Sequence, residues 1–517
     1  MELTAATLFF LSVISLMILV SLLGRGVSNK RRPPGPRCFP FIGSLHHLLT
    51  AQPQVALRDL ANKHGPVMYL RLGQVDAVVI SSPATAQEVL RDNNLTFASR
   101  PRMLGTDIFS YGNLDIAFSA YGAYWRTLRK LCTAELLSPR KVKQFAAIRD
   151  SETMSLVRNV REAGGGGKPV NLGRLVVSCV NAITAKATLG EGCPAELQER
   201  FLSAMKAMLN LCGKHLIGDL FPSLRFVDVL TGTRGRLWGV RGKLDAIFEE
   251  IIDGCEARQG MKKTQDDDLL SVMLRIKEEG QLEFPVAIGR TNIKAIIVDM
   301  FTAGTETTST TIEWIMSELM RNPKMMAKAQ AEVRRTLDKK SPQDHDGLME
   351  KLHYTKMLIK EVLRLHTPAP LLLPRVCRET CNVGGFDVAA GSTVIINAWA
   401  IARSPEHWSD DADEFRPERF NDDSAAPDYN GTQYKYVPFG SGRRICPGSN
   451  FALAVVELIV ARLLYYFDWS LPSGIPPHAL DMDMVVDMSA RRRNQLHIIP
   501  TLYENPTMEN QTCSSLE

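Results

Sequence analysis

The sequence lacks the cysteine and charge patterns that mark several classes of protein. Its 10 cysteines are scattered without a C-x-x-C pair, which excludes a disulfide scaffold and a structural zinc site. The 61 Lys and Arg residues against 56 Asp and Glu leave a net charge of only +5, too little to indicate a nucleic-acid partner. No internal repeat is visible. The chain has 517 residues, of which 45% are hydrophobic, so it can bury a large core.

One long hydrophobic run is present at the N-terminus. Residues 3–23 are uncharged, and about 20 residues suffice for a helix to cross a bilayer. A cleaved signal peptide is the alternative, but only Glu2 precedes the run, which exceeds the roughly 7–15 apolar residues of a signal sequence. Basic residues follow at positions 25, 30, 31 and 32, and such residues stay on the cytoplasmic side. We therefore expect a single-pass anchor over residues 1–24, with the rest of the chain in the cytosol.

Behind the anchor, the pattern predicts one mainly helical domain with small β elements. Residues 25–40 are basic and proline-rich and predict a stiff hinge. The domain is expected over 41–502, before a polar, disordered tail at 503–517. Strands are expected at 65–73 and 77–82 as a hairpin, near 375–378 and 393–396, and within 482–500. Helices are expected at 85–93, 123–137, 141–162, 172–188, 195–213, 236–259, 267–279, 289–320, 323–338, 353–366 and 449–466.

The most specific functional signal is a glycine-rich loop, Pro438–Gly448, which carries one cysteine directly before an apolar helix. Its glycines permit positive φ and a close approach of the backbone to a flat ligand. Cys446 precedes the helix N-terminus, where free amides and the helix dipole favour a thiolate, so we expect a lowered pKa and a metal ligand. Arg444 could pair with a carboxylate on the ligand. A buried structural cysteine in a glycine-rich turn is the alternative.

A second signal lies within the expected helix 289–320. Ala303 and Thr307 are four residues apart on one face, so the Thr307 hydroxyl can donate to the Ala303 carbonyl and open the helix locally. Glu306 beside Thr307 forms an acid–alcohol pair that could relay protons. A threonine-rich turn with an exposed Glu306 is the alternative.

Two further helical pairs carry charges or N–H donors. Glu361 and Arg364 are three residues apart, a spacing that by itself indicates a surface ion pair worth less than about 1 kcal/mol. Trp125 and Arg129 lie one helical turn apart and could both donate to a single carboxylate. Core packing is the alternative for Trp125.

The pattern Phe439-x-x-Gly442-x-Arg444-x-Cys446-x-Gly448 resembles the haem-binding signature of the cytochrome P-450 monooxygenases, and the resemblance extends over nearly the whole chain. It implies the cytochrome P-450 fold, mainly α with small β-sheets, preceded by an N-terminal transmembrane helix. It also implies haem b with Cys446 as the axial iron ligand, whose electron donation favours O–O cleavage. The other implied cofactor contacts are Trp125, Arg129, Ala303, Arg375, Phe439, Arg444 and Gly448.

The same resemblance assigns roles to the helical patterns. Thr307 and Glu306 match the family's oxygen-activating motif, with Glu in place of the commoner Asp, and would be catalytic. Glu361 and Arg364 would form a buried structural triad with Arg419.

The resemblance also implies how electrons arrive. They would come from NADPH through a separate NADPH–cytochrome P-450 reductase, with a cytochrome b-type protein as a second donor, since no flavin or NADPH fingerprint follows the loop. A basic surface around Arg126 and Lys130 could receive the reductase, although a solvated helix face is the alternative.

The implied substrate pocket is mainly apolar and favours a lipophilic molecule. The segments Pro33–Pro36, Asp219–Leu224 and Asn397–Ile401 resemble plant microsomal members of the seventy-one clan, closest to grass enzymes that oxidise diterpene hydrocarbons in phytoalexin (defence) biosynthesis. We therefore expect hydroxylation or further oxidation of a diterpene at the endoplasmic reticulum membrane. The expected pocket residues are Met103, Ile108, Phe109, Asp299, Phe301, Leu371, Leu372, Val486 and Met488, although Asp299 could instead face a neighbouring helix.

Other functions remain compatible with parts of this pattern. A sesquiterpenoid, or a phenylpropanoid or flavonoid, is the alternative substrate. A haem-thiolate isomerase or dehydratase would share the cysteine loop, but it would not need the acid–alcohol turn at Glu306 and Thr307. A non-catalytic haem sensor would not need a deep apolar pocket.

Overall fold

The computed structural model describes residues 31–503, apart from 191–192, 213–215, 262–267, 280–287, 422–426 and 473. The expected anchor at 3–23, the first part of the hinge and the tail from 504 onward lie outside the described residues. Within the described part, Tyr503 is held in place, because its N–H donates to the Tyr466 carbonyl at 2.8 Å.

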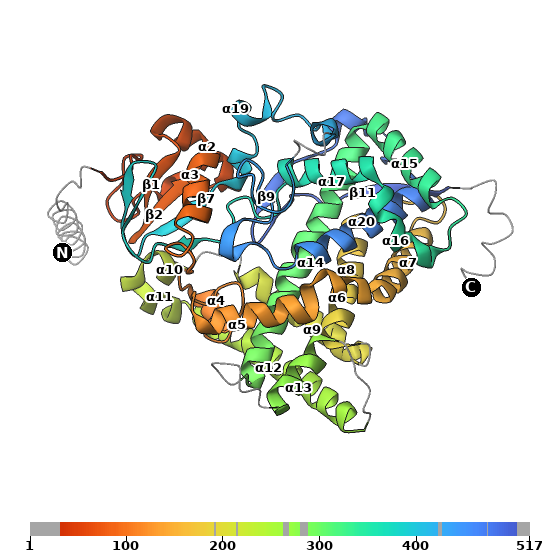
Figure 1. Ribbon diagram of the computed structural model, residues 1–517, viewed down its shortest axis with the longest axis horizontal. Coiled ribbons are helices and arrows are strands. Elements are labelled where there is room, and N and C mark those ends of the chain that lie inside the picture. Colours follow the sequence, from red (N-terminus) through yellow and green to blue (C-terminus); the bar gives the residue numbers. More distant parts are fainter. Residues whose placement is uncertain are drawn as a thin grey trace, which may run out of the picture.

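The chain forms a large helical part and a smaller part built on strands (Figure 1). Helix α14 (Arg290–Arg321) runs through the middle of the molecule. It begins after Gly289, whose N–H donates to Asn292 Oδ1 at 2.9 Å. It ends at Arg321 because Asn322 precedes a proline, and such a residue disfavours the helical conformation.

Three helices pack directly against α14 and form the core beside it: α8 (Leu172–Leu189), α17 (His353–Leu365) and α20 (Ser449–Tyr466). By length and composition α8 and α20 could cross a membrane, but 61% of each lies buried inside the protein, as expected for core helices. The other α-helices are α2 (Pro53–His64), α3 (Pro83–Gln87), α4 (Leu104–Phe109), α5 (Ala123–Cys132), α6 (Pro139–Gln144), α7 (Ala146–Ala163), α9 (Ala195–Cys212), α10 (Ile217–Leu220), α11 (Arg225–Leu230), α12 (Thr233–Met261), α13 (Leu269–Glu279), α15 (Pro323–Leu337), α16 (His345–Leu348), α18 (Ala398–Ile401) and α19 (Pro405–Trp408).

The largest sheet has the order β1-β2-β7-β4. Strands β1 (Val67–Leu72) and β2 (Val75–Ile80) form the expected hairpin, with a turn at Gly73, where φ is +64°. Strand β7 (Thr393–Ile396) joins β2 in parallel, with Ala77 opposite Thr393. The remaining strands are β3 (Val170–Asn171), β4 (Arg375–Val376), β5 (Cys381–Val383), β6 (Phe386–Val388), β8 (Phe467–Ser470), β9 (Met484–Val486), β10 (Ala490–Arg492) and β11 (His497–Leu502).

Local pattern placed most long helices correctly, but it missed some breaks and short elements. The single helix expected at 141–162 is divided into α6 and α7 at Phe145, whose buried ring packs against Phe451 on α20. Helix α2 was not expected, nor were strands β5, β6 and β8. These elements are short or lack a clear hydrophobic period, so their formation depends on packing against distant segments.

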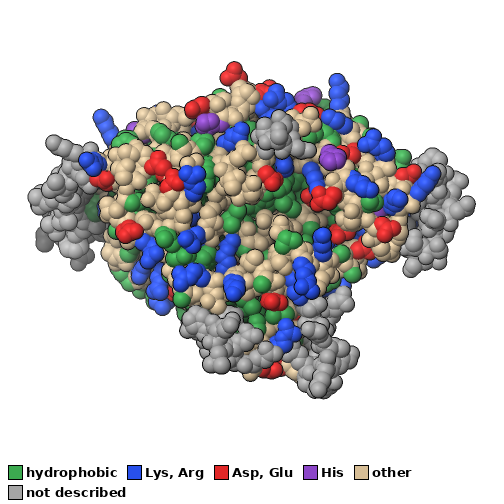
Figure 2. All heavy atoms as spheres, in the orientation of Figure 1, with side chains coloured by type: hydrophobic (Ala, Val, Ile, Leu, Met, Phe, Trp, Pro, Cys, Tyr) green, Lys and Arg blue, Asp and Glu red, His purple; other side chains and the backbone are tan. Residues whose placement is uncertain are grey.

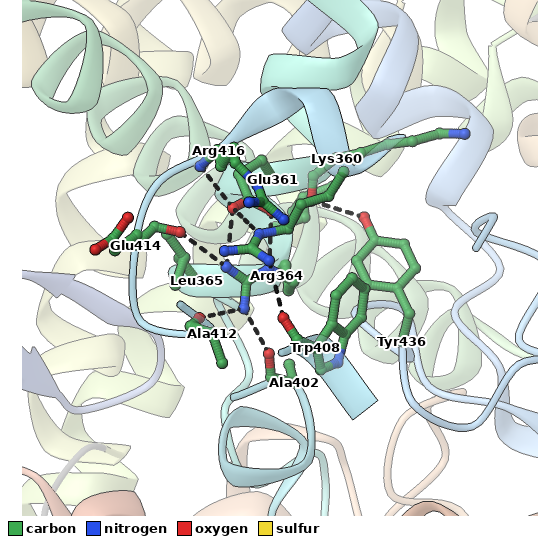
Figure 3. Close-up of polar contacts among 12 residues, drawn as sticks. Lys360, Glu361, Arg364, Leu365, Ala402, Trp408, Ala412, Glu414, Arg416 and Tyr436 are labelled. Carbon is green, nitrogen blue, oxygen red and sulfur yellow. Dashed lines mark hydrogen bonds and ion pairs between the residues drawn. The ribbon is translucent and has the colours of Figure 1, made fainter. Parts of the chain in front are cut away.

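A buried polar network fixes α17 to the segment that precedes the cysteine loop (Figure 3). Glu361 and Arg364 are both 0% exposed and are joined by two hydrogen bonds of 2.7 and 2.8 Å. Arg364 also donates to the carbonyls of Ala402 and Ala412 at 2.7 and 2.6 Å. The pair is therefore buried within one network, as the family resemblance implies, and is not the surface ion pair that the spacing alone indicates.

Arg419 also belongs to this network, but it lies farther from Glu361 than Arg364 does. Its Nε lies 3.4 Å from Glu361 Oε1, while its Nη1 is 2.7 Å from Asp411 Oδ1. The 3.4 Å contact lacks hydrogen-bond geometry, so Arg419 binds mainly Asp411 and contributes charge to Glu361.

Candidate active site

The loop with Cys446 leads into α20, whose N-cap is Gly448. The Cys446 N–H donates to the Phe439 carbonyl at 2.9 Å, which folds the loop back on itself. The Cys446 side chain faces a cavity beneath α14. Pro447 lies just before the N-cap residue, outside the helix.

The protonation of Cys446 differs from the expectation. Burial raises the pKa of the Cys446 thiol, although the amides of Gly448 and Ser449 and the Arg129 guanidinium act in the opposite direction. The predicted lowering of the pKa is therefore wrong for the chain alone, because desolvation outweighs the helix N-terminus. A coordinated metal cation reverses this balance, since it deprotonates a thiol ligand.

Two glycines of the loop adopt a conformation that other residues avoid. Gly440 and Gly442 have φ of +70° and +69°, whereas Gly448 has φ of −93° and needs no such freedom. A Cβ at Gly442 would lie 2.1 Å from the Leu90 carbonyl oxygen. A Cβ at Gly440 would meet nothing within 4 Å, because Gly440 borders the cavity.

Replacing Gly442 with alanine is expected to lower the unfolding free energy by more than the ~1–3 kcal/mol of left-handed strain, because the backbone of Leu90 blocks the added Cβ. Gly166→Ala is the matched control, since Gly166 has φ of +72° and nothing within 4 Å of its Cβ position. Urea unfolding of both variants measures the difference. Equal losses would show that the approach to Leu90 has no energetic importance.

The cavity runs between α14 and the cysteine loop and is mainly apolar. On the face in Figure 2, hydrophobic side chains gather near the middle and charged side chains lie around them. Helix α14 contributes the lining residues Asp299, Met300, Ala303, Gly304, Thr307, Thr308 and Thr311. The opposite wall is formed by the cysteine loop and α20, through Pro438, Phe439, Gly440, Cys446, Phe451, Ala452 and Val456. A third wall is formed by α17 and the segment after it, through Leu363, Pro368, Ala369, Leu372 and Leu373.

Four arginines line the same cavity: Arg100, Arg129, Arg375 and Arg444. Burial, followed by repulsion from Arg375 and Arg129, lowers the pKa of Arg444 to about 9. Burial also lowers the pKa of Arg375 to about 10. The Arg375 Nε has no hydrogen-bond partner among the described residues. A cluster of buried cations with a free donor fits an anionic ligand.

These features fit a haem group. The Cys446 thiol is a suitable iron ligand, the open space beside Gly440 and Phe439 suits a flat ring, and the arginines suit the two propionates. Phe439, expected as a cofactor contact, borders this space and packs edge-on against Tyr429, with ring centroids 5.7 Å apart.

The acid–alcohol turn on α14 has the predicted backbone contact. Thr307 Oγ1 donates to the Ala303 carbonyl at 2.6 Å, and both residues border the cavity. Glu306 points toward the turn between β9 and β10, where Ser489 Oγ donates to its carboxylate at 3.0 Å. Glu306 is therefore not the exposed acid of the alternative, but among the described residues it is not part of the cavity lining.

Trp125 does not reach the cavity in the described structure. Its Nε1–H donates to the Ile116 carbonyl at 3.0 Å, and its ring lies under the Arg444 guanidinium, 4.2 Å from the centroid. The one N–H donor of Trp125, expected as a cofactor contact, is thus bound to backbone in this structure. Arg129 does border the cavity, and one of its N–H groups donates to the Ile445 carbonyl.

Only part of the expected substrate pocket lines the cavity. Asp299 and Leu372 do so, and the open question about Asp299 is resolved in favour of the cavity. Phe301 does not, because its ring packs against Phe201 with centroids 4.4 Å apart on the other side of α14. Within the described chain, the expected residues outside the lining are Met103, Ile108, Phe109, Phe301, Leu371, Val486 and Met488.

Contacts elsewhere in the protein explain why several of these residues lie outside the cavity lining. Ile108 and Phe109 are 2% and 3% exposed and belong to the helical core. Leu371 packs with the cluster under the four-stranded sheet, and Val486 binds the Ala51 carbonyl through its N–H. Met488 is 40% exposed.

Sequence reasoning also missed several lining residues. Arg100 comes from the segment before α4, and Thr184 and Thr188 come from α8. Arg100 followed by a proline was a visible signal, but its role depends on contacts with the carbonyls of Leu373 and Pro374 far along the chain. Thr308 also lines the cavity, and its buried hydroxyl has no partner in the described part of the chain.

Known proteins resemble this chain over nearly its full length. The family model described as Cytochrome P450 matches residues 33–495. The 9-beta-pimara-7,15-diene oxidase of Oryza sativa subsp. japonica is 58% identical over 506 residues, covering 98% of this chain and 99% of that protein. Cytochrome P450 CYP99A1 of Sorghum bicolor is 60% identical over 494 residues, covering 92% and 94%. A zebra fish cytochrome P450 structure with progesterone shares the fold, with 23% identity, a TM-score of 0.73, and coverage of 87% and 99%.

Proposed function

The chain belongs to the cytochrome P450 family and is a haem-dependent monooxygenase, and on this basis we propose that it oxidises a diterpene hydrocarbon of the pimaradiene type. One observation carries the proposal: 58% identity over 506 residues with a protein named as an oxidase of such a diene. The mainly apolar cavity beside Cys446 supports it, because a hydrocarbon needs few polar partners.

Residues of the cavity would hold the cofactor and orient the substrate. The Cys446 Sγ would ligate the haem iron, and Arg100, Arg375 and Arg444 would bind its propionates. When bound, the haem supplies the iron that activates dioxygen. Apolar side chains such as Leu372 exclude water and hold the hydrocarbon by contact alone.

Proton delivery would depend on the turn at Thr307. The Thr307 hydroxyl is aimed along α14 by its bond to Ala303 and lies at the cavity surface, where it can pass a proton inward. Glu306 precedes Thr307 in the chain, and its carboxylate accepts a hydrogen bond from Ser489. Through this contact with the β9–β10 turn, the carboxylate can exchange protons with solvent.

Thr307→Ala is expected to uncouple the reaction, so that the share of NADPH electrons recovered in product falls by about tenfold or more while hydrogen peroxide rises. Thr307→Ser should keep most of the coupling, because it keeps the hydroxyl. Ser309→Ala is the control: among the described residues, the Ser309 hydroxyl binds only the carbonyls of Thr305 and Glu306. Unchanged coupling in Thr307→Ala would mean that Thr307 serves packing alone.

The proposal includes a partner and a location. Electrons would come from NADPH through a separate flavoprotein reductase, and the exposed side chain of Arg126 on α5 would form part of its contact surface. Residues 3–23 would anchor the enzyme in the endoplasmic reticulum membrane with its catalytic domain in the cytosol, as the apolar run and the basic residues after it indicate.

The substrate is tested with microsomes that contain the full chain and a reductase. They are supplied with NADPH and, in separate assays, with 9β-pimara-7,15-diene, a sesquiterpene hydrocarbon and a phenylpropanoid precursor. The proposal predicts that oxygenated product forms from the diterpene at a rate at least tenfold above the rate with either other substrate. A clear preference for the sesquiterpene or the phenylpropanoid would contradict it.

A further inference from the structure

Four successive backbone amides of the loop after α4 donate to two carboxyl groups. The amides of Ile116 and Ala117 donate to Asp299 Oδ2 at 2.7 and 3.0 Å. The amides of Phe118 and Ser119 both donate to Asp115 Oδ1 at 3.0 Å. Asp299 belongs to α14, one turn before Ala303, whereas Asp115 belongs to the loop itself. Two aspartates therefore hold every amide of residues 116–119.

The carbonyls of the same loop are held by cationic and aromatic donors. Arg444 Nη1 donates to the Ile116 carbonyl at 3.0 Å, and Trp125 Nε1 donates to the same oxygen. Arg100 Nε donates to the Ala117 carbonyl at 2.9 Å. Ile116 and Ala117 line the cavity. The loop is thus a wall of the active site that joins α14 to the arginine cluster.

The amides of Ala117 and Phe118 are neighbours in the chain and donate to different carboxyl groups, so the carboxyls of Asp299 and Asp115 lie next to each other. Asp115 is 1% exposed, and Asp299 is half-buried, where it borders the cavity and binds the loop amides. Two carboxylates in contact cannot both be ionised without a large cost, so the pair favours holding one proton.

The surroundings raise the pKa of both carboxyl groups. Burial, then the nearby Asp299, raises the pKa of Asp115 well above its usual value. Burial raises the pKa of Asp299 to about 6, opposed by the amides of Ile116 and Ala117, the contact with Asp115 and the Arg100 cation. Arg444 also faces both carboxyls, and Cys132 and Tyr124 of α5 face Asp299. The pKa of each carboxyl is therefore raised, that of Asp115 well above its usual value, and this favours one proton held by the pair.

We propose that Asp115 and Asp299 form a proton-sharing positioning pair, which fixes residues 116–119 as the wall of the cavity and so sets how tightly an apolar substrate fits. The pair stabilises the wall through four amide bonds while carrying a single negative charge next to Arg100 and Arg444. This role is independent of which hydrocarbon the enzyme oxidises.

The wall is tested by hydrogen–deuterium exchange of the peptide that contains residues 116–119. Asp299→Ala removes the acceptor of two amides, and exchange should accelerate by about tenfold or more. Asp299→Asn keeps an oxygen for those amides and an N–H for Asp115, so its exchange should stay within about threefold of the wild type. Equal protection in the wild type and Asp299→Ala would overturn the proposal, as would full loss of protection in Asp299→Asn.

The shared proton is tested separately by infrared spectroscopy at neutral pH. The wild type minus Asp115→Asn difference should contain the carbonyl band of a protonated carboxylic acid, because the wild-type pair holds one proton. Absence of that band would show that both carboxyl groups are ionised, which would contradict the proposal that they share a proton.

The effect on the cavity is measured with 4-phenylimidazole as the probe in a spectral titration of the haem-loaded enzyme. Asp299→Ala should weaken binding by about tenfold, while the reduced carbon monoxide spectrum stays of the wild-type form. Asp299→Asn should bind the probe within about threefold of the wild type. Unchanged affinity in Asp299→Ala would show that the wall does not determine fit.

Discussion

Cys446→Ala is expected to reduce oxygenation to background while leaving the chain folded. Cys446 places its sulfur at the cavity surface opposite α14, where it would be the only protein ligand that the signature loop supplies to the haem iron. Its side chain is small, and its N–H bond to Phe439 involves backbone alone, so the loop conformation should survive the substitution. The measurements are product formation with reductase and NADPH, and the unfolding midpoint.

Cys179→Ala is the matched control for this substitution. Cys179 is also buried, at 6% exposure, but its thiol donates to the Glu152 carbonyl on α7, away from the cavity. Its replacement should cost stability comparable to that of Cys446→Ala and leave activity in place. Retained oxygenation in Cys446→Ala, or equal loss in both variants, would refute the assignment of the ligand.

Arg364→Ala should produce the largest loss of stability. Arg364 and Glu361 are both fully buried, and removing one partner of a buried pair typically costs about 3–5 kcal/mol, because the other charge loses its partner. The variant also leaves the carbonyls of Ala402 and Ala412 without a donor. The free energy of unfolding of a native protein is only about 5–15 kcal/mol. We therefore expect most of the variant to be unfolded or free of haem at 37 °C.

A surface pair of the same geometry provides the control. Arg200 and Glu250 are joined by two hydrogen bonds of 2.8 Å, but their side chains are 47% and 48% exposed. Arg200→Ala should therefore cost less than about 1 kcal/mol. Comparable losses in the two variants, measured by urea unfolding, would show that burial of the Glu361–Arg364 pair is not what makes it important.

The features that the sequence predicted correctly depend on residues close together in the chain. The hairpin of β1 and β2 follows from alternating residues and one glycine turn. The bond between Thr307 and Ala303 follows from helical spacing, and the position of Cys446 just before a helix follows from residues within a single loop. In each case the partners lie within one element or one turn, where local pattern determines geometry.

The features that the sequence could not predict depend on distant contacts. Asp299 binds the amides of residues 116–117, more than 180 positions away, and this separation leaves no local signal. The side chain of Phe301 turns away from the cavity because Phe201 of α9 packs against it. The hydrophobic pattern of a helix predicts which residues of α14 share a face. It does not predict which other helix packs against that face.

The electrostatic expectation for Cys446 was wrong for a related reason. The sequence shows a cysteine before a helix, and that position alone favours a thiolate. The enclosure of the thiol by the cavity walls, which raises its pKa, is a property of the folded chain. The same limit applies to Arg375, whose unpartnered Nε is visible only after β4 is placed beside the loop.

The most direct test of haem bound through Cys446 is the absorption spectrum of the purified, haem-loaded full chain after reduction and addition of carbon monoxide. A thiolate ligand predicts a strongly red-shifted Soret band. The band should disappear in Cys446→Ala and remain in Cys179→Ala. A band at the position typical of histidine-ligated haem in the wild type would contradict the assignment of Cys446 and of the site built around it.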